Sequence, residues 1–273
     1  TYFTTSCRGV SFYEAPRSYA GQCPRRILMG TTDARLLAVD ADTGQLCTSF
    51  GHEGQIDLTK NLGDVKENLY MVTSAPAIVS GNAVLGGWVF DNLEIKEPSG
   101  VIRAFDAITG EFAWAWDMGR PGVRTEPADG EIYTRGTPNM WSLFSVDNER
   151  GIVYAPLGNE TPDYFGAQRH EASEKYASAV VALNGETGGL VWSYQTVHHD
   201  IWDYDLPSQP TLIDIPDSAG NLIPALVQAT KRGEVFLLNR ETGEPIAEVE
   251  ERAVPQGGVP EDFTAPTQPF SAL

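Results

Sequence analysis

A short sequence recurs four times in this chain, and it limits the possible fold more than any other feature. Each copy is an apolar run that ends in Asp or Asn, with a glycine four residues later; the copies are 36–44, 101–110, 180–188 and 235–243. The Asp or Asn side chain caps a turn, and the glycine takes the left-handed conformation that lets a second strand return. The repeat therefore predicts four β-hairpins, with return strands such as 111–116 and 189–194.

The spacing of these hairpins predicts how they are assembled. The intervals between copies leave room for a second hairpin and a long loop, so we expect each unit to be a four-stranded antiparallel blade. A blade cannot bury both faces alone, and such units stack radially into a β-propeller. Trp114 and Trp192, each four residues after the turn glycine, are predicted to pack between blades. We expect an all-β fold in which residues 1–273 form one partial propeller domain and no second domain.

Charge and hydrophobicity exclude several classes of function. The 273 residues include 19 Lys and Arg against 37 Asp and Glu, a net charge of −18. Nucleic acids and anionic membrane surfaces are held mainly by cationic side chains, so neither is an expected partner. The longest uncharged stretch, 68–90, contains Pro76 and several glycines, and we interpret it as two strands with a turn at 80–82 rather than a membrane helix. No signal peptide is visible, so any targeting signal is expected outside this chain.

The cysteines give no metal or redox motif. Cys7, Cys23 and Cys47 are too widely spaced for a CxxC site and too few for a disulfide framework. One disulfide with one free thiol and three buried thiols are equally consistent with the sequence.

Several long loops carry residues suited to chemistry, and in a propeller the loops display the functional groups. Asp91 and Asn92 place a carboxylate beside an amide oxygen, both of them hard ligands for calcium or magnesium. Arg8, next to a glycine, is suited to a two-pronged contact with a carboxylate. Trp141 follows a proline turn and offers an indole on which a flat ligand can rest.

The densest polar segment is 198–205, which contains three carboxylates, two imidazoles and two aromatic rings. Such a run is a poor strand and indicates coordination or catalysis. A metal-dependent hydrolase built on His198 and His199 is one alternative. Adjacent side chains on an extended chain point in opposite directions, however, and no HExxH spacing is present, which disfavours that alternative.

Together these loops and repeats resemble the periplasmic domain of membrane-bound dehydrogenases that depend on pyrroloquinoline quinone (PQQ) and act on glucose, quinate, shikimate or related polyols. The resemblance covers nearly the whole chain. The stretches that carry it are 7–10, 23–26, 91–92, 137–141, 161–163, 198–207 and 266–270. It implies an eight-bladed propeller with PQQ and a divalent ion, Ca²⁺ or Mg²⁺, on its axis, of which this chain would supply roughly half.

The resemblance also implies a role for individual residues. Asp203 corresponds to the general base that takes the proton of the substrate hydroxyl. Lys231 corresponds to the cation beside the quinone oxygens, where it acts in catalysis and in cofactor binding. The remaining correspondences are Asp91 and Asn92 to contacts with the metal and the cofactor, Trp141 to the ring beneath PQQ, and Arg8, Thr73 and Thr161 to polar contacts with PQQ.

Two departures from the family pattern bear on substrate and metal. Tyr13 stands where glucose-oxidising members carry a histidine over the cofactor, which predicts that quinate, shikimate or another cyclic polyol is preferred to glucose. Asn159 resembles a metal-binding asparagine of the related soluble alcohol dehydrogenases and predicts an extra ligand for the ion.

The resemblance places the protein on the periplasmic side of the bacterial inner membrane. The membrane would be reached only through a segment outside this chain, and electrons would pass to ubiquinone. A non-catalytic propeller scaffold remains an alternative, but a scaffold has no use for Asp91, Trp141, Asp203 and Lys231 together.

Overall fold

The structure is a computed structural model, which describes residues 6–273. It is nearly all β, as the repeat predicts. The first sheet has the order β1 (Ser11–Glu14), β2 (Arg25–Gly30), β3 (Arg35–Asp40), β4 (Gln55–Asp57); the second has the order β10 (Phe112–Trp116), β9 (Ile102–Asp106), β7 (Asn82–Leu85), β6 (Ala77–Val79); the third has the order β11 (Ser145–Asp147), β12 (Ile152–Pro156), β13 (Ala179–Asn184), β14 (Leu190–Gln195). All neighbouring strands in these sheets are antiparallel.

The fourth repeat forms a smaller sheet than predicted. It contains β15 (Thr211–Pro216), β16 (Leu222–Ala229) and β17 (Val235–Asn239), whereas β18 (Val249–Ala253) pairs with β19 (Thr267–Ser271) in a separate hairpin. After the turn at Gly243 the chain makes one bridge, between Leu238 and Pro245. The residues on either side of Pro245 still bond β17, because Asn239 N–H donates to the carbonyl of Glu244 and Ile246 N–H donates to the carbonyl of Leu237.

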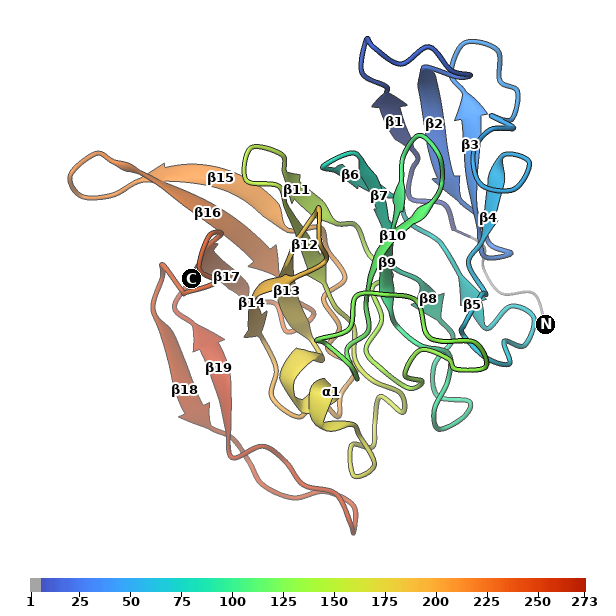
Figure 1. Ribbon diagram of the computed structural model, residues 1–273. Coiled ribbons are helices and arrows are strands. Elements are labelled where there is room, and N and C mark those ends of the chain that lie inside the picture. The colour runs from blue at the N-terminus through green and yellow to red at the C-terminus, as the bar shows by residue number, and fades with distance from the viewer. Residues whose placement is uncertain (1–5) are drawn as a thin grey trace.

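The sheets follow one another along an arc, from the first sheet to the β18–β19 hairpin (Figure 1). Their innermost strands are in contact, β1 with β6, β6 with β11, and β11 with β15. Two short strands, β5 (Tyr70–Met71) and β8 (Trp88–Val89), form a further pair, and one short helix, α1 (Glu171–Tyr176), precedes β13. This helix was not predicted from the sequence. The radial arrangement of antiparallel sheets is that of a β-propeller.

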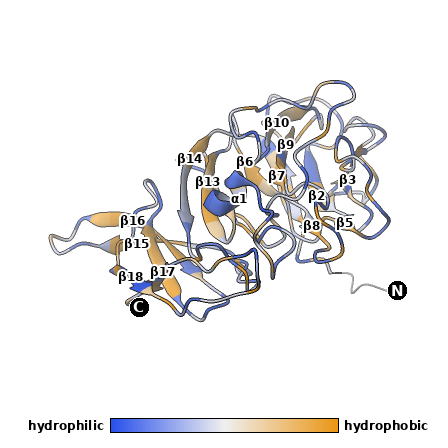
Figure 2. Cartoon of the chain, turned by 90° about the horizontal axis from the view of Figure 1, so that it is seen from below, coloured by the Kyte–Doolittle hydropathy of each residue, from blue (hydrophilic) through white to orange (hydrophobic). Residues whose placement is uncertain are grey.

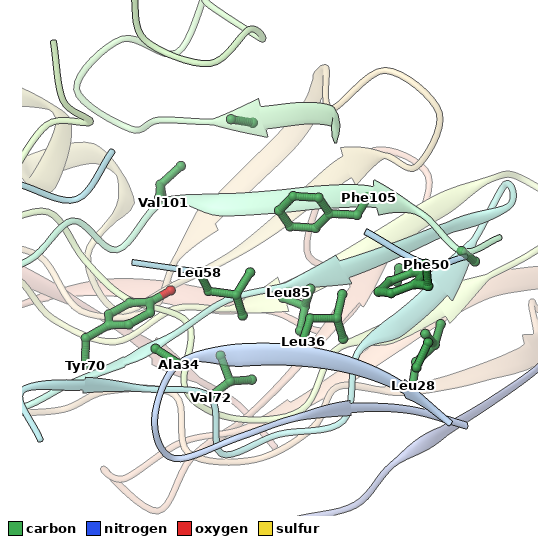
Figure 3. Packing of buried hydrophobic residues seen from close by; sticks show 14 of the residues in the cluster. Leu28, Ala34, Leu36, Phe50, Leu58, Tyr70, Val72, Leu85, Val101 and Phe105 are labelled. Carbon is green, nitrogen blue, oxygen red and sulfur yellow. The ribbon is translucent and has the colours of Figure 1, made fainter. Parts of the chain in front are cut away.

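The hydrophobic core is divided among the spaces between successive sheets. Between the first two sheets, Leu28 and Leu36 face Leu85 and Phe105, as Figure 3 shows. Equivalent clusters lie between the second and third sheets and between the third and fourth. Apolar residues are concentrated on the strands, whereas α1 is hydrophilic (Figure 2).

The repeated turns hold neighbouring sheets together. In the third copy the side chain of Asn184 accepts hydrogen bonds from the backbone N–H groups of Glu186 and Thr187, and Gly188 has φ +68°. The indole of Trp114 lies against Gly188 and donates from Nε1 to the carbonyl of Gly185 at 3.0 Å. Trp192 makes the same contact with the turn of the fourth sheet. The prediction that these tryptophans pack between blades is confirmed.

The structure also resolves the two expectations about the apolar segment and the cysteines. Residues 77–85 form the β6–β7 hairpin predicted for 68–90. Within 6–273 no helix has the length and apolar character needed to cross a bilayer. Cys23 and Cys47 form a disulfide and Cys7 is an exposed thiol, which is the first of the two cysteine arrangements considered above.

Candidate active site

The predicted functional residues come from long loops that meet at one end of the sheets. Trp141 precedes β11, and Arg8 precedes β1. The guanidinium of Arg8 lies 5.1 Å from the centre of the Trp141 ring and donates to the hydroxyl of Thr73 at 2.6 Å. Thr73 in turn donates to the carbonyl of Trp141 at 3.3 Å. Three residues that are far apart in the sequence thus form one surface with an indole, a cation and a hydroxyl.

A lysine and two aspartates lie next to this surface. Lys231, after β16, donates from Nζ to Asp203 Oδ1 at 2.8 Å, to the Asp203 carbonyl at 2.9 Å and to Asp205 Oδ2 at 3.1 Å. Burial would lower the pKa of Lys231, but the two carboxylates outweigh it and raise the pKa. The ammonium is therefore held in its charged form between them.

Asp205 contacts both Lys231 and the indole of Trp141. Its Oδ2 accepts from Trp141 Nε1 at 3.3 Å, and its Oδ1 accepts from the backbone amide of Asn159 at 2.5 Å. Burial raises the pKa of Asp205 to about 6, and Lys231 opposes that rise. Asp205 was not among the site residues predicted from the sequence. Its place in the alternation Asp203-Tyr204-Asp205 was the available signal, because residues two apart on an extended segment share a face.

A second polar group forms around Asn92, which follows β8. Both ends of the Asn92 side-chain amide are hydrogen-bonded to Asp163. Nδ2 donates to the Asp163 carboxylate at 2.6 Å, and Oδ1 accepts from the Asp163 backbone N–H at 2.9 Å. The backbone N–H of Asn92 donates to the hydroxyl of Thr161 at 3.3 Å, and its side-chain Nδ2 also donates to the carboxylate of Asp91 at 3.3 Å. Asp163 is a further residue of this group that the sequence-based assignment did not include.

Electrostatics couple the two polar groups. Burial raises the pKa of Asp91, and the nearby Asp203 raises it further. Burial also raises the pKa of Asp163 to about 8, with additional repulsion from Asp91, Asp205 and Asp203. The carboxyl groups of Asp91, Asp163, Asp203 and Asp205 therefore act on one another in a region that also contains the ammonium of Lys231.

Asn159 lies between the loops, where both ends of its side-chain amide are hydrogen-bonded and the oxygen keeps one lone pair. Its Nδ2 donates to the carbonyls of Asp200 and Asp163, and its Oδ1 accepts from the amide of Glu160. No group of three His, Cys, Asp or Glu side chains in residues 6–273 is arranged to hold a metal ion. A cation site here would therefore have to combine carboxylate oxygens with the amide oxygens of Asn92 and Asn159.

The two adjacent histidines do not converge on a common point. His199 is buried, and its ring nitrogens face Glu174 at 2.9 Å and Asp262 at 2.8 Å. The ring nitrogens of His198 face Gln195 and Glu251. Because all four nitrogens are engaged by different partners, the hydrolase alternative based on this pair is not supported.

Tyr13 is the one predicted site residue that the structure does not bring to the others. Its ring packs against the core between the first two sheets, and the charged groups that affect its pKa, Asp106 and Arg26, lie near the turn end of the strands. By contrast, Gly100, just before the start of β9, lies against Pro138 and Asn139 in the loop that carries Trp141, so this loop is at the opposite end of β9 from Asp106. No contact in the described residues joins Tyr13 to the other predicted cofactor residues, so its place over the cofactor and the substrate preference drawn from it stay predictions.

Comparison with known proteins identifies the group to which these loops belong. The family described as "PQQ: Glucose/ethanol/alcohol dehydrogenase, beta-propeller domain" matches residues 1–273. The chain belongs to this family.

Curated relatives within the family act on different substrates. The chain is 45% identical over 271 residues to the glycerol dehydrogenase large subunit of Gluconobacter thailandicus, covering 98% of this chain and 37% of that protein. It is 44% identical over 273 residues to the quinoprotein glucose dehydrogenase of Escherichia coli, covering 98% and 34%. It is 39% identical over 282 residues to the quinate/shikimate dehydrogenase (quinone) of Acinetobacter baylyi, covering 97% and 36%. The chain thus spans about a third of the length of these relatives.

Solved structures agree with the fold. The quinohemoprotein alcohol dehydrogenase ADHIIG of Pseudomonas putida HK5 has a TM-score of 0.66 and 26% identity, covering 92% of this chain and 36% of that chain. The quinohemoprotein alcohol dehydrogenase of Comamonas testosteroni has a TM-score of 0.67 and 23% identity, covering 97% and 38%. The second likeness supports the propeller fold alone.

The residues of this site fit the family's cofactor. PQQ is a flat quinone with carboxylate groups, so it suits an indole face flanked by the cations Arg8 and Lys231 and by the hydroxyls of Thr73 and Thr161. The raised pKa values of Asp91 and Asp163 reflect buried carboxyl groups that repel each other when ionised. A divalent cation beside them would relieve that repulsion, and oxygen donors are the ligands that Ca²⁺ and Mg²⁺ prefer.

Proposed function

We propose that the protein containing this chain is a PQQ-dependent dehydrogenase that oxidises a hydroxyl group of a polyol or sugar. The observation that carries the proposal is the contact network Trp141–Asp205–Lys231–Asp203, which combines a flat apolar face, a cation and a carboxylate at one point. The family match over residues 1–273 and the relatives named for glycerol, glucose and quinate support the same substrate class, polyols and sugars.

In this proposal Asp203 is the general base. Its Oδ1 is bound to Lys231, and no residue in the range 6–273 hydrogen-bonds its Oδ2. The side chain is 31% exposed, so Oδ2 can reach a substrate hydroxyl and accept its proton. Lys231 orients the carboxylate, because its ammonium donates to Oδ1 at 2.8 Å and to the Asp203 carbonyl at 2.9 Å.

Other residues of the chain hold the cofactor and the ion. Trp141 provides the face on which the rings rest, and Asp205 fixes the indole through its Nε1. Arg8, with Thr73, binds a carboxylate of the cofactor, and Thr161 adds a polar contact. Asp91, Asn92 and Asn159 supply the oxygens for Ca²⁺ or Mg²⁺. When bound, PQQ supplies an electron-accepting quinone and the ion supplies a Lewis acid.

The wider setting of the enzyme follows from its relatives. We propose that electrons pass to ubiquinone and that the site faces the periplasm of a bacterial cell, with a membrane segment outside this chain. The relatives named for quinate carry the word quinone in their names, which supports a quinone acceptor. Glycerol, glucose and quinate are the first substrates to test, because each is named for at least two of the relatives.

The test uses the full-length protein loaded with PQQ and Ca²⁺ or Mg²⁺. Wild type should reduce a ubiquinone analogue with at least one of the three substrates, and chelation of the ion should stop turnover. Asp203→Asn keeps the shape of the side chain and removes its basicity, so it should retain PQQ and lose turnover by roughly 10²–10⁴-fold. Failure of the wild type to bind PQQ would instead favour the non-catalytic propeller scaffold.

A further inference from the structure

Asp200 is a buried carboxylate close to the proposed base, and no role has been assigned to it. It lies three residues before Asp203, and its side chain is screened from solvent. Its Oδ1 accepts from the backbone N–H of Trp202 at 3.0 Å. Its Oδ2 accepts from the backbone N–H of Tyr204 at 2.8 Å and from the hydroxyl of Ser178 at 2.6 Å.

These bonds flank Asp203 on both sides. Asp203 has φ +62°, in the left-handed region that residues with a side chain adopt at an energetic cost. The two N–H groups that Asp200 holds belong to the peptide group between Ile201 and Trp202 and to the one between Asp203 and Tyr204. The carboxylate of Asp200 therefore fixes the peptide group that directly follows the base and one peptide group shortly before it, and these contacts help to maintain a backbone conformation at Asp203 that is unfavourable on its own.

The orientation of the Asp203 carboxylate depends on this backbone geometry. Lys231 Nζ bonds both the carbonyl and the side chain of Asp203, so the lysine reaches both acceptors only while the backbone keeps this conformation. The carbonyl of Asp200 also accepts from Asn159 Nδ2 at 2.8 Å. Asp200 thus ties the segment that carries the base to the loop that carries Asn159.

We propose that Asp200 is a positioning residue that holds the backbone of Asp203 so that its carboxylate faces the substrate hydroxyl. This inference rests on the proposed function, because it assumes that Asp203 is the base. It adds a residue that touches neither substrate nor cofactor and acts only through the two amides beside Asp203.

The chemistry of the three donors explains why the residue is an aspartate. Two N–H groups and one hydroxyl point at the side chain, and a carboxylate accepts from all three. An asparagine has one oxygen, and its NH₂ group would face either the Trp202 amide or the Tyr204 amide, so one backbone bond would be lost. A glutamate keeps the charge, but its additional methylene moves both oxygens away from these amides.

The experiment compares Asp200→Asn and Asp200→Glu with wild type in the full-length protein loaded with PQQ and Ca²⁺. Both variants should bind PQQ with an affinity close to that of wild type, because Asp200 makes no contact with the cofactor residues Trp141, Arg8 or Lys231. In each, kcat should fall roughly 100-fold, the loss typical of a reacting group that is misplaced by about 1 Å. The matched control is Ser178→Ala, which removes the third donor and leaves both loop amides bound; its kcat should change by no more than about threefold.

A readout that does not depend on turnover is amide hydrogen exchange of the protein without PQQ. The amides of Trp202 and Tyr204 should be protected in wild type and in Ser178→Ala, and should exchange faster in both Asp200 variants. In addition, Asp200→Asn introduced into an Asp203→Asn protein should lower kcat by no more than about twofold further, because residues that act as a unit are not additive.

The outcomes separate this inference from the proposed function. A wild type without dehydrogenase activity would overturn the proposed function and the role of Asp200 with it. An active wild type whose Asp200 variants turn over normally, or keep the two amides protected, would overturn the role of Asp200 alone. A full second loss of kcat in the double variant would also overturn it, because Asp200 would then act on something other than Asp203.

Discussion

Replacing Gly188 with alanine should destabilise the protein far more than the backbone cost of its turn conformation alone indicates. Its φ of +68° alone costs an alanine about 1–2 kcal/mol. In addition, the new Cβ would lie 2.5 Å from the Trp114 ring, so the indole must move. Overpacking of this kind costs about 1–3 kcal/mol, and loss of the Trp114–Gly185 hydrogen bond about 1 kcal/mol. We expect a total loss of about 3–6 kcal/mol.

The matched control is Gly220→Ala. Gly220 has φ +86°, and no atom lies within 4 Å of its added Cβ, so only the backbone cost of about 1–2 kcal/mol applies. Urea denaturation of the full-length protein, followed by fluorescence and circular dichroism, gives the loss for each variant. Gly243→Ala, beside Trp192, should behave like Gly188→Ala.

Equal losses for Gly188→Ala and Gly220→Ala would refute the reasoning, because the indole contact would then contribute nothing. A double variant gives a second check. Trp114→Leu removes the ring that the alanine meets, so the combination with Gly188→Ala should lose less stability than the sum of the two single changes.

Three further predictions concern the cofactor, pH and substrate. Trp141→Ala, or removal of the ion with a chelator, should weaken PQQ binding by roughly tenfold or more in isothermal titration, since the rings lose either their stacking face or a ligand; unchanged affinity in both would contradict the site. Burial alone would raise the pKa of Asp147, but hydrogen bonds and charges from Arg150 and Arg240 lower it. Its stabilising contribution is therefore present above the unfolded pKa of about 4 and lost as pH falls through the lower folded value. Asp147→Asn should cost about 2 kcal/mol in urea unfolding at pH 7 and progressively less below about pH 4; a constant cost would argue against it. Tyr13→His should leave the ratio of kcat/KM for glucose and quinate within about twofold of wild type, because the ring packs in the core between sheets; a clear shift toward glucose would restore Tyr13 to the cofactor pocket.

Much of the fold could be predicted because its signals are local. The Asp or Asn cap and the glycine lie within five residues of each other, and the adjacent apolar runs became β3, β9, β13 and β17. The fourth sheet differed from the expectation, since after Gly243 the chain bonds β17 only around Pro245 and then continues into the separate β18–β19 hairpin. The short helix α1 has no strong apolar period, and most of its residues face solvent, so no pattern indicated it.

The candidate site was less predictable, because its contacts join loops that are distant in the sequence. The pairing of Asn92 with Asp163 spans 71 residues, and the contact of Trp141 with Asp205 spans 64. Residue type and family resemblance indicated Trp141, Asp203 and Lys231, which the structure brings together. They did not indicate which carboxylates share one electrostatic environment, because burial and mutual repulsion depend on the assembled loops.

The indole contacts between sheets also have a direction. Each tryptophan binds the turn of the sheet that follows it, so the two surfaces that meet are different and the association is head-to-tail. Such heterologous contacts have no internal stopping point; they end only when successive rotations bring the last unit back to the first. Within residues 6–273 the turn glycine of the first sheet, Gly44, has no atom within 4 Å of an added Cβ. Among the turns of the described sheets, the one at Gly44 is therefore the surface of this kind that no described side chain covers.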